Sequence, residues 1–113
     1  MTYVFDIDGT ICEKPSKIHD DGSYSESVPN YNRINKINQL YAEGHTIHFL
    51  TARGMGRSEN KSPNLFRDIT EKQLKDWGVN YDELFMGKPA GDFYIDDKAV
   101  KFTDWKNTIN QLL

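Results

Sequence analysis

The chain alternates short hydrophobic stretches, each followed by polar residues, with longer stretches whose apolar residues recur at helical spacing, and this pattern limits its fold most strongly. Strands are predicted over 2–8, 45–51, 83–87 and 92–96, and helices over 29–43, 63–77 and 99–113. Strands that alternate with helices form a parallel sheet with helices on both faces. We therefore predict an α/β domain of three layers, α/β/α.

Size and composition bound this prediction. The chain has 113 residues, 37% of them hydrophobic, and a net charge of −3, so we expect one globular domain over 1–113 without a nucleic-acid or membrane partner. No apolar run is long enough to span a membrane, and no signal peptide is recognisable. A single cysteine, Cys12, excludes an intrachain disulfide and agrees with a cytoplasmic location. Nothing beside Cys12 suggests a lowered pKa, so we interpret it as a bystander.

Residues that carry chemistry lie at the end of each predicted strand or directly after it. In chain order they are Asp6 and Asp8, then Thr51, then Lys88, then Asp96 and Asp97. Residues two apart in an extended strand point to the same side, so Asp6 and Asp8 can face one site, and Gly9 allows a tight turn beside it. In open parallel sheets, ligands bind beyond the carboxyl ends of the strands. One site at this edge is therefore expected.

The charges of this site predict what it binds. Several carboxylates in one place repel each other unless a cation neutralises them, and a divalent ion with oxygen ligands, Mg²⁺ above all, suits them. Lys88, Thr51 and Arg53 are then available for an anion with several acceptor oxygens. A phosphoryl group fits that description, because its transfer depends on positioning and charge neutralisation.

Four short motifs give the chain a family resemblance. FDIDGT, the strand that ends in LTAR, the lysine of GKP, and YIDD occur in that order between Val4 and about Lys98. They resemble the four ordered motifs of the haloacid dehalogenase-like (HAD) hydrolase superfamily. The resemblance implies a Rossmann-like fold and a Mg²⁺-dependent phosphatase that works through a phospho-aspartate.

The resemblance also implies a role for each motif residue in catalysis. Asp6 would be the nucleophile that receives the phosphoryl group. Asp8 would protonate the leaving group and then activate the water that releases phosphate. Thr51 would hydrogen-bond the phosphoryl group, and Lys88 would neutralise charge on it and on Asp6.

The metal ligands are implied in the same way. Asp96 would bind Mg²⁺ together with Asp6 and the backbone carbonyl of Asp8. Asp97 would act behind these ligands or through water.

No cap domain fits between the motifs, which implies an open site. Specificity would then depend on the loops 12–28 and 53–61 or on a second copy of the chain covering the site. Substrate contacts are expected from the strand-end residues Gly9, Thr10 and Ala52 and from the arginines Arg53 and Arg57. For Arg53, contact with the substrate and a place on the surface are both open.

Three functions compete. The leading hypothesis is a phosphatase of a small phosphorylated metabolite, with a sugar phosphate as the expected example. A polynucleotide 3′-phosphatase shares similar motifs, but the chain is acidic and lacks a kinase P-loop. From another class, a receiver-like phospho-acceptor module or a phosphometabolite-binding protein would use similar residues. The order of the motifs disfavours a receiver, which has its phosphorylated aspartate alone on a middle strand.

Overall fold

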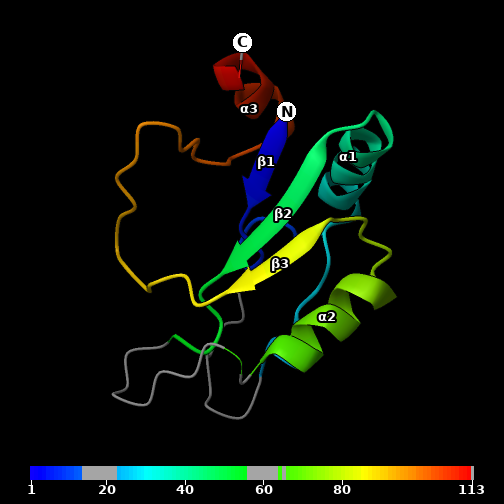
Figure 1. The fold of residues 1–113 in the computed structure, drawn as a ribbon, viewed down its shortest axis with the longest axis vertical. Coiled ribbons are helices and arrows are strands. Elements are labelled where there is room, and N and C mark those ends of the chain that lie inside the picture. Colours follow the sequence, from blue (N-terminus) through cyan, green and yellow to red (C-terminus); the bar gives the residue numbers. More distant parts are fainter. Residues whose placement is uncertain (14–22, 56–63, 65, 113) are drawn as a thin grey trace.

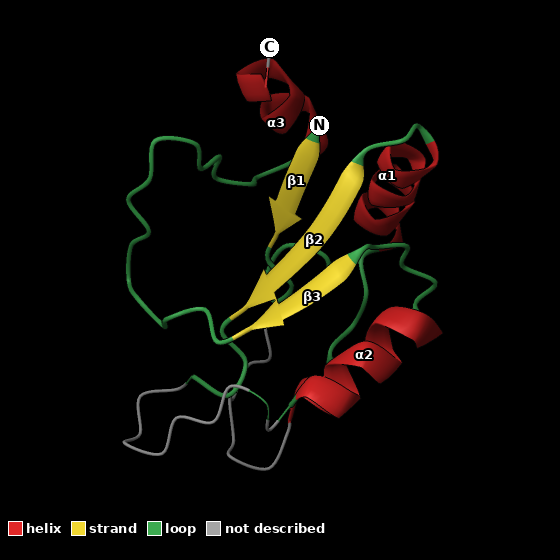
Figure 2. Ribbon diagram, in the orientation of Figure 1, coloured by secondary structure: helices red, strands yellow, loops and turns green. Residues whose placement is uncertain are grey.

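The computed structural model describes residues 1–13, 23–55, 64 and 66–112, and its centre is a parallel sheet of three strands. The strands are β1 (Thr2–Phe5), β2 (Thr46–Thr51) and β3 (Glu83–Met86), in the order β1-β2-β3. In the register, Phe5 lies beside Phe49, and Thr51 lies beside Met86. All three arrows point to the same end (Figure 2), so the residues that follow the strands gather there.

Helices lie between and after the strands (Figure 1). They are α1 (Tyr31–Ala42), α2 (Arg67–Asp76) and α3 (Trp105–Leu112), with a short 3-10 helix η1 (Ser23–Glu26) before α1. The Asn30 side chain caps α1 by accepting a hydrogen bond from the Arg33 amide at 3.2 Å. Gly44 follows α1 at φ 95°, as the sequence predicts for a helix end. The three predicted helices are confirmed with shorter bounds; the predicted start of the second helix, at residue 63, lies outside the described residues.

One hydrophobic core joins the sheet to the helices. Phe5, Phe49 and Leu84 are neighbours in the register of the three strands, and all three pack in this core. The helices contribute Ile34 and Ile37 from α1, Leu74 from α2 and the partly buried Trp105 from α3. Full burial of such side chains stabilises a fold by about 1.5–3 kcal/mol each, so this core fixes where the strand ends lie relative to the helices.

The predicted class of fold is confirmed: the chain is a small Rossmann-like α/β domain with a parallel sheet, and the residues that the structure describes form no cap. Among the residues that the structure describes, no helix is both long and apolar enough to cross a bilayer.

The predicted strand over 92–96 is wrong. This segment forms no strand and pairs with none, and Phe93 and Ile95 are 86% and 98% exposed. Its local bonds favour a turn, because the Tyr94 hydroxyl donates to the Pro89 carbonyl at 2.6 Å and accepts from the Gly91 amide. Strand preference depends on a neighbouring strand, and here the hydrophobic residues have none.

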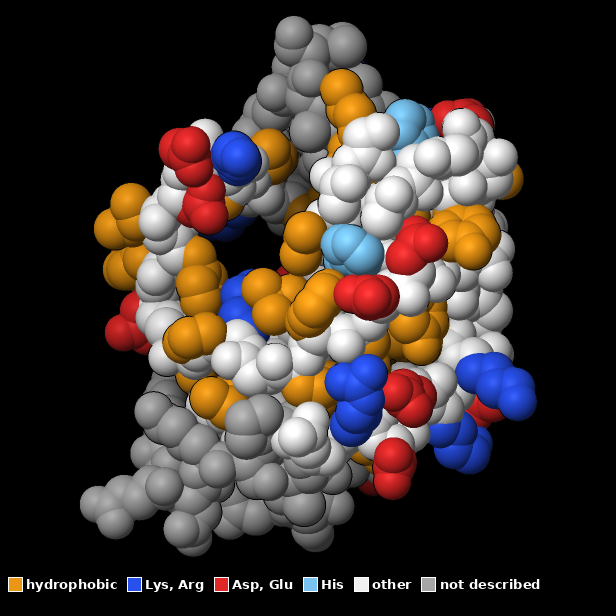
Figure 3. Space-filling view, in the orientation of Figure 1, with side chains coloured by type: hydrophobic (Ala, Val, Ile, Leu, Met, Phe, Trp, Pro, Cys, Tyr) orange, Lys and Arg blue, Asp and Glu red, His pale blue; other side chains and the backbone are white. Residues whose placement is uncertain are grey.

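The space-filling view agrees with this correction. In Figure 3 an opening separates the segment after β3, on the left, from the body of the domain. The same segment runs as a wide loop away from β1 in Figure 1 before it returns to α3. Residues that follow 92–96 are therefore not carried to the sheet edge by a strand.

Candidate active site

Three of the four motifs meet at the carboxyl end of the sheet. Asp6 follows β1, Thr51 ends β2, and Lys88 lies two residues beyond β3. The Lys88 amide donates to the Thr51 carbonyl at 3.0 Å, which extends the β2–β3 pairing past the end of β3. The Lys88 Nζ lies 3.9 Å from Oδ1 of Asp6. The sheet itself therefore places a cation beside the predicted nucleophile.

A tight turn carries the chain from Asp6 past Asp8. The amides of Thr10 and Ile11 both donate to the Ile7 carbonyl, at 3.0 and 2.9 Å. Gly9 has φ 83°, a conformation that side chains with a Cβ rarely adopt, so the sequence prediction of a tight turn here is confirmed. This turn separates the surroundings of the two carboxylates: Asp6 lies beside Lys88, whereas Asp8 binds a different cation.

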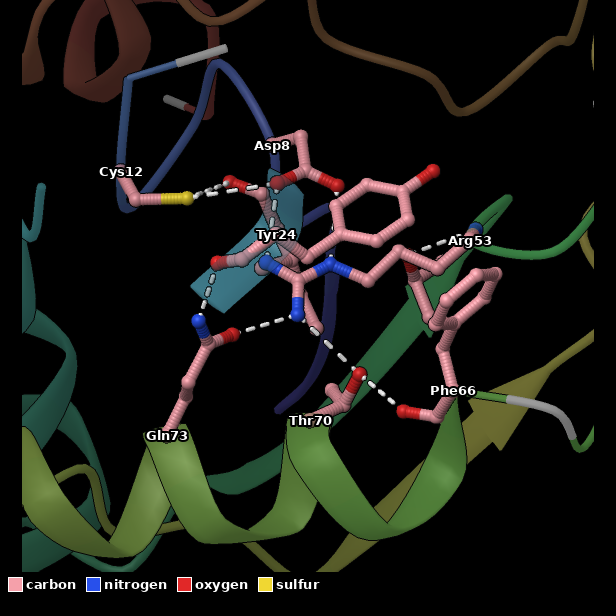
Figure 4. Close-up of polar contacts among 9 residues, drawn as sticks. Asp8, Cys12, Tyr24, Arg53, Phe66, Thr70 and Gln73 are labelled. Carbon is pink, nitrogen blue, oxygen red and sulfur yellow. Dashed lines mark hydrogen bonds and ion pairs between the residues drawn. The ribbon is translucent and has the colours of Figure 1, made fainter. Parts of the chain in front are cut away.

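That second cation is Arg53. Its Nε and Nη2 donate to Oδ2 and Oδ1 of Asp8 at 3.0 and 2.9 Å (Figure 4). Its Nη1 donates to two side chains of α2, Thr70 at 3.1 Å and Gln73. The guanidinium also stacks 4.6 Å from the ring centre of Tyr24. The surface alternative for Arg53 is therefore wrong, and direct contact with a substrate would require the guanidinium to leave these partners.

Thr51 is buried at the end of β2. Its Oγ1 accepts a hydrogen bond from the Arg53 amide at 3.2 Å. After Ala52 the chain turns again, with the Met55 amide donating to the Ala52 carbonyl and Gly54 at φ 81°. Arg57 lies outside the described residues, and its contact with substrate stays a prediction.

Two other predicted substrate contacts, Gly9 and Thr10, accept hydrogen bonds from a side chain of the protein. The Arg33 Nη1 donates to the carbonyls of Thr10 and Gly9, at 3.0 and 3.4 Å. Its Nη2 donates to the Thr103 carbonyl at 3.0 Å, and its guanidinium lies 4.6 Å from the ring centre of Phe102. Arg33 thus ties the turn after β1 to the segment before α3. The substrate role of Gly9, Thr10 and Ala52 stays a prediction.

The two carboxylates of the fourth motif do not join the other three motifs, although its Tyr94 ring lies over Lys88. Asp96 ends the unpaired segment 92–96 and Asp97 follows it, and both residues are exposed. The Lys98 amide donates to Asp96 Oδ1 at 2.7 Å, and this bond is the main reason that the pKa of Asp96 is lowered. Within the described part of the chain, no three acidic, histidine or cysteine side chains form a group that could hold a metal. The predicted ligand set is thus incomplete in this arrangement.

Cys12 lies directly against the Asp8 carboxylate. Its thiol is buried and donates to Asp8 Oδ1 at 3.5 Å. Burial, and then the negative charge of Asp8, raise the pKa of Cys12 to about 12. A thiol with this pKa is protonated at neutral pH, which agrees with its interpretation as a bystander.

Sequence reasoning missed the residues that contact the site residues and the turn after β1 and hold them in place. They are Tyr24, Arg33, Thr70, Gln73 and Tyr94. Thr70 and Gln73 left a signal, since they are polar residues three apart on the buried face of α2. The ring of Tyr94 lies over Lys88, with Nζ 4.2 Å from the ring centre. Its placement in a predicted strand concealed this contact.

The fold, with an aspartate, a lysine and a threonine at the carboxyl end of its sheet, agrees with a phosphatase of the HAD class. The chain belongs to the family described as the polynucleotide kinase PNKP phosphatase domain, whose model matches residues 1–111. The crystal structure of an MCSG target from Vibrio cholerae is similar, with a TM-score of 0.72 and 26% identity over 98% of this chain and 94% of that one. No curated protein matches the chain significantly.

Proposed function

We propose that this phosphatase transfers the phosphoryl group of a small phosphorylated metabolite first to Asp6 and then to water. A sugar phosphate is the expected substrate. The observation that supports the proposal most is the Asp6 carboxylate at the sheet edge with Lys88 Nζ 3.9 Å away and Thr51 on the neighbouring strand. A carboxylate beside a cation can approach a phosphate dianion that it would otherwise repel.

The reaction has two steps. In the first, an Asp6 oxygen attacks phosphorus, the bond from phosphorus to the ester oxygen breaks, and that oxygen takes a proton from Asp8. In the second, water attacks phosphorus while Asp8 removes a proton from that water, and the bond from phosphorus to Asp6 breaks. Phosphate leaves, and both carboxyl groups regain their starting states. Asp8 serves as acid and then as base.

Dependence on Mg²⁺ belongs to the same proposal and rests on family membership. Asp6, the backbone carbonyl of Asp8 and Asp96 would hold the ion, with Asp97 behind them. Among the described residues, no three of Asp6, Asp8, Asp96 and Asp97 form a group that could hold a metal, so the described arrangement does not fit a complete site. No step above is derived through the ion.

A polynucleotide 3′-phosphatase is the second candidate, and the family match favours it. The charge of the chain weighs against it, because a net charge of −3 repels a nucleic-acid backbone. The arginines of the described site are also engaged: Arg33 binds backbone carbonyls and Arg53 binds Asp8. They offer no positive track for a strand.

A turnover screen separates these functions. The purified chain is incubated with Mg²⁺ and phosphorylated sugars, nucleotides or 3′-phosphate oligonucleotides, with Asp6→Asn as the blank. We expect the highest kcat/KM on a small monoester, with little dependence on salt. If the chain is a polynucleotide 3′-phosphatase, the 3′-phosphate oligonucleotide should instead have the highest kcat/KM. That kcat/KM should fall steeply between about 50 and about 200 mM salt. Absence of turnover on every substrate would favour a receiver-like or binding module.

A further inference from the structure

Arg53 meets Asp8 as a fork. Two parallel hydrogen bonds join Nε and Nη2 to the two oxygens of one carboxylate. Such a pair fixes both the distance and the plane of the carboxylate, which a single ammonium group cannot do. The Arg53 side chain is 0% exposed, so water does not compete for these bonds.

The guanidinium is itself held from the opposite side (Figure 4). Its Nη1 donates to Thr70 and Gln73, which lie on one face of α2. Both partners are fixed in turn: the Thr70 hydroxyl donates to the Phe66 carbonyl at 2.6 Å, and the Gln73 amide donates to the Tyr24 carbonyl. Rotation of Arg53 would break several of these bonds together. A chain of hydrogen bonds therefore links α2 and η1 to the carboxylate of Asp8.

The geometry leaves Asp8 able to exchange a proton. Each carboxylate oxygen has two lone pairs, and the fork uses one on each. The Cys12 thiol donates to the second on Oδ1, so among the described contacts Oδ2 keeps one for a proton. Asp8 is 19% exposed, whereas the guanidinium behind it is completely buried. The Asp8 side chain is therefore partly open to solvent, although its cation partner is not.

A role in stability alone explains this arrangement poorly. A buried ion pair often stabilises a fold no better than apolar side chains of the same volume. Here the pair also requires polar side chains on the buried face of a helix that otherwise contributes Leu74 to the core. A position that needed only volume would not need these partners.

We propose that Arg53 is a positioning residue that orients the Asp8 carboxylate, and that α2 contributes to this orientation because its Thr70 and Gln73 hold Arg53 in place. The inference rests on the proposed function, because it takes Asp8 as the group that moves the proton. It differs from a substrate contact, since Arg53 acts through Asp8 and not on the phosphate ester.

Kinetics of an Arg53→Lys variant test the inference. Lysine keeps the charge but cannot form the fork, so kcat on 4-nitrophenyl phosphate should fall on the order of ten- to a hundredfold with KM unchanged. In the Asp8→Asn background the same substitution should cost nothing further. If the losses of the two variants multiply, or if KM rises while kcat stays, Arg53 does not act through Asp8. Arg67→Lys on the exposed side of α2 is the matched control and should keep full activity.

Thr70→Val provides a second test of the same inference, which still applies if the Arg53→Lys variant does not fold. Valine has nearly the shape of threonine and removes one partner of Nη1, so kcat should fall less than in Arg53→Lys, again at constant KM. A Thr70→Val enzyme with unchanged kcat would overturn the part of the inference that includes α2.

A spectroscopic measurement separates this inference from the proposed function. The Arg53 Nε–H should give a slowly exchanging NMR resonance that shifts in Asp8→Asn but not in Asp6→Asn. If the resonance behaves so and Arg53→Lys is fully active, the positioning role is wrong while the phosphatase remains. If wild-type protein shows this resonance but hydrolyses no phosphate ester, the proposed function is wrong, and the inference falls with it.

Discussion

The Nζ of Lys88 lies 3.9 Å from Oδ1 of Asp6 and 4.2 Å from the centre of the Tyr94 ring. The lysine therefore has both an anion and an aromatic face beside it, and both stabilise its ammonium group. The backbone hydrogen bond from Lys88 to Thr51 fixes the start of its side chain. These contacts hold the cation beside Asp6, the proposed nucleophile.

Replacing Asp6 tests the nucleophile directly. Asp6→Asn is nearly isosteric, so the fold should persist, and phosphatase turnover should be abolished because an amide oxygen is a poor nucleophile. Circular dichroism and steady-state kinetics measure the two effects. Substantial residual turnover would mean that the covalent mechanism is wrong.

Removing the ring over Lys88 should weaken the site mildly. An exposed cation–π contact contributes about 0.5–1 kcal/mol, so Tyr94→Leu should lower kcat/KM by about two- to fivefold. Tyr94→Phe keeps the ring and loses only the hydroxyl, and it should retain most activity. Equal losses in both variants would assign the effect to the bond between the Tyr94 hydroxyl and Pro89.

Metal removal tests the incomplete ligand set. A chelator should abolish activity, and added Mg²⁺ should restore it. Asp96→Ala should weaken metal binding, measured by the Mg²⁺ concentration that gives half-maximal rate, more than Asp97→Ala does. Equal effects would show that the ligand assignment is wrong, and full activity in excess chelator would remove the metal from the mechanism.

The thiol of Cys12 should resist alkylation. Its pKa is raised to about 12, chiefly by burial, so at pH 8 the reactive thiolate is a very small fraction in the folded protein. Iodoacetamide should therefore modify native protein much more slowly than protein unfolded in urea, where the pKa returns to its usual range. Equal rates in the two states, followed by mass spectrometry, would contradict the burial of this thiol.

Arg53 and Arg57 should now behave differently, although the sequence places both in one loop. Arg57→Ala should raise KM for the native substrate and spare a small aryl phosphate, because a charge in this loop can meet an anionic substrate group. Steady-state kinetics on both substrates check this split. Equal loss on the two would place Arg57 in the chemistry common to all phosphate esters, and no loss would leave it on the surface.

The sequence predicted the sheet, its direction and the first three motif positions, because each depends on local pattern. Apolar runs define strands, and parallel strands bring their ends together regardless of detail. Asp6, Thr51 and Lys88 therefore lie together as expected. The same reasoning failed for 92–96, where alternation and aromatic residues resembled a strand but no neighbour pairs with it.

The surroundings of Asp8 could not be predicted, because they depend on distant residues. Arg53 reads as a loop residue beside two glycines, and only its contacts with α2 reveal that it is buried. Polar residues on the buried face of a helix indicate a hidden partner, yet they do not identify it. Sequence pattern thus predicted where the candidate catalytic groups lie, but not which residues orient Asp8.

The contacts around Arg53 also have a consequence for synthesis on the ribosome. Its bond to Asp8 spans 45 positions of the chain, and the bond from Gln73 to Tyr24 spans 49. Asp8 therefore leaves the ribosome well before the last of these partners. Until they follow, its carboxylate in the nascent chain lacks the hydrogen bonds that orient it. Since closing such long loops costs entropy that only the finished contacts repay, the first motif to be made is among the last to be completed.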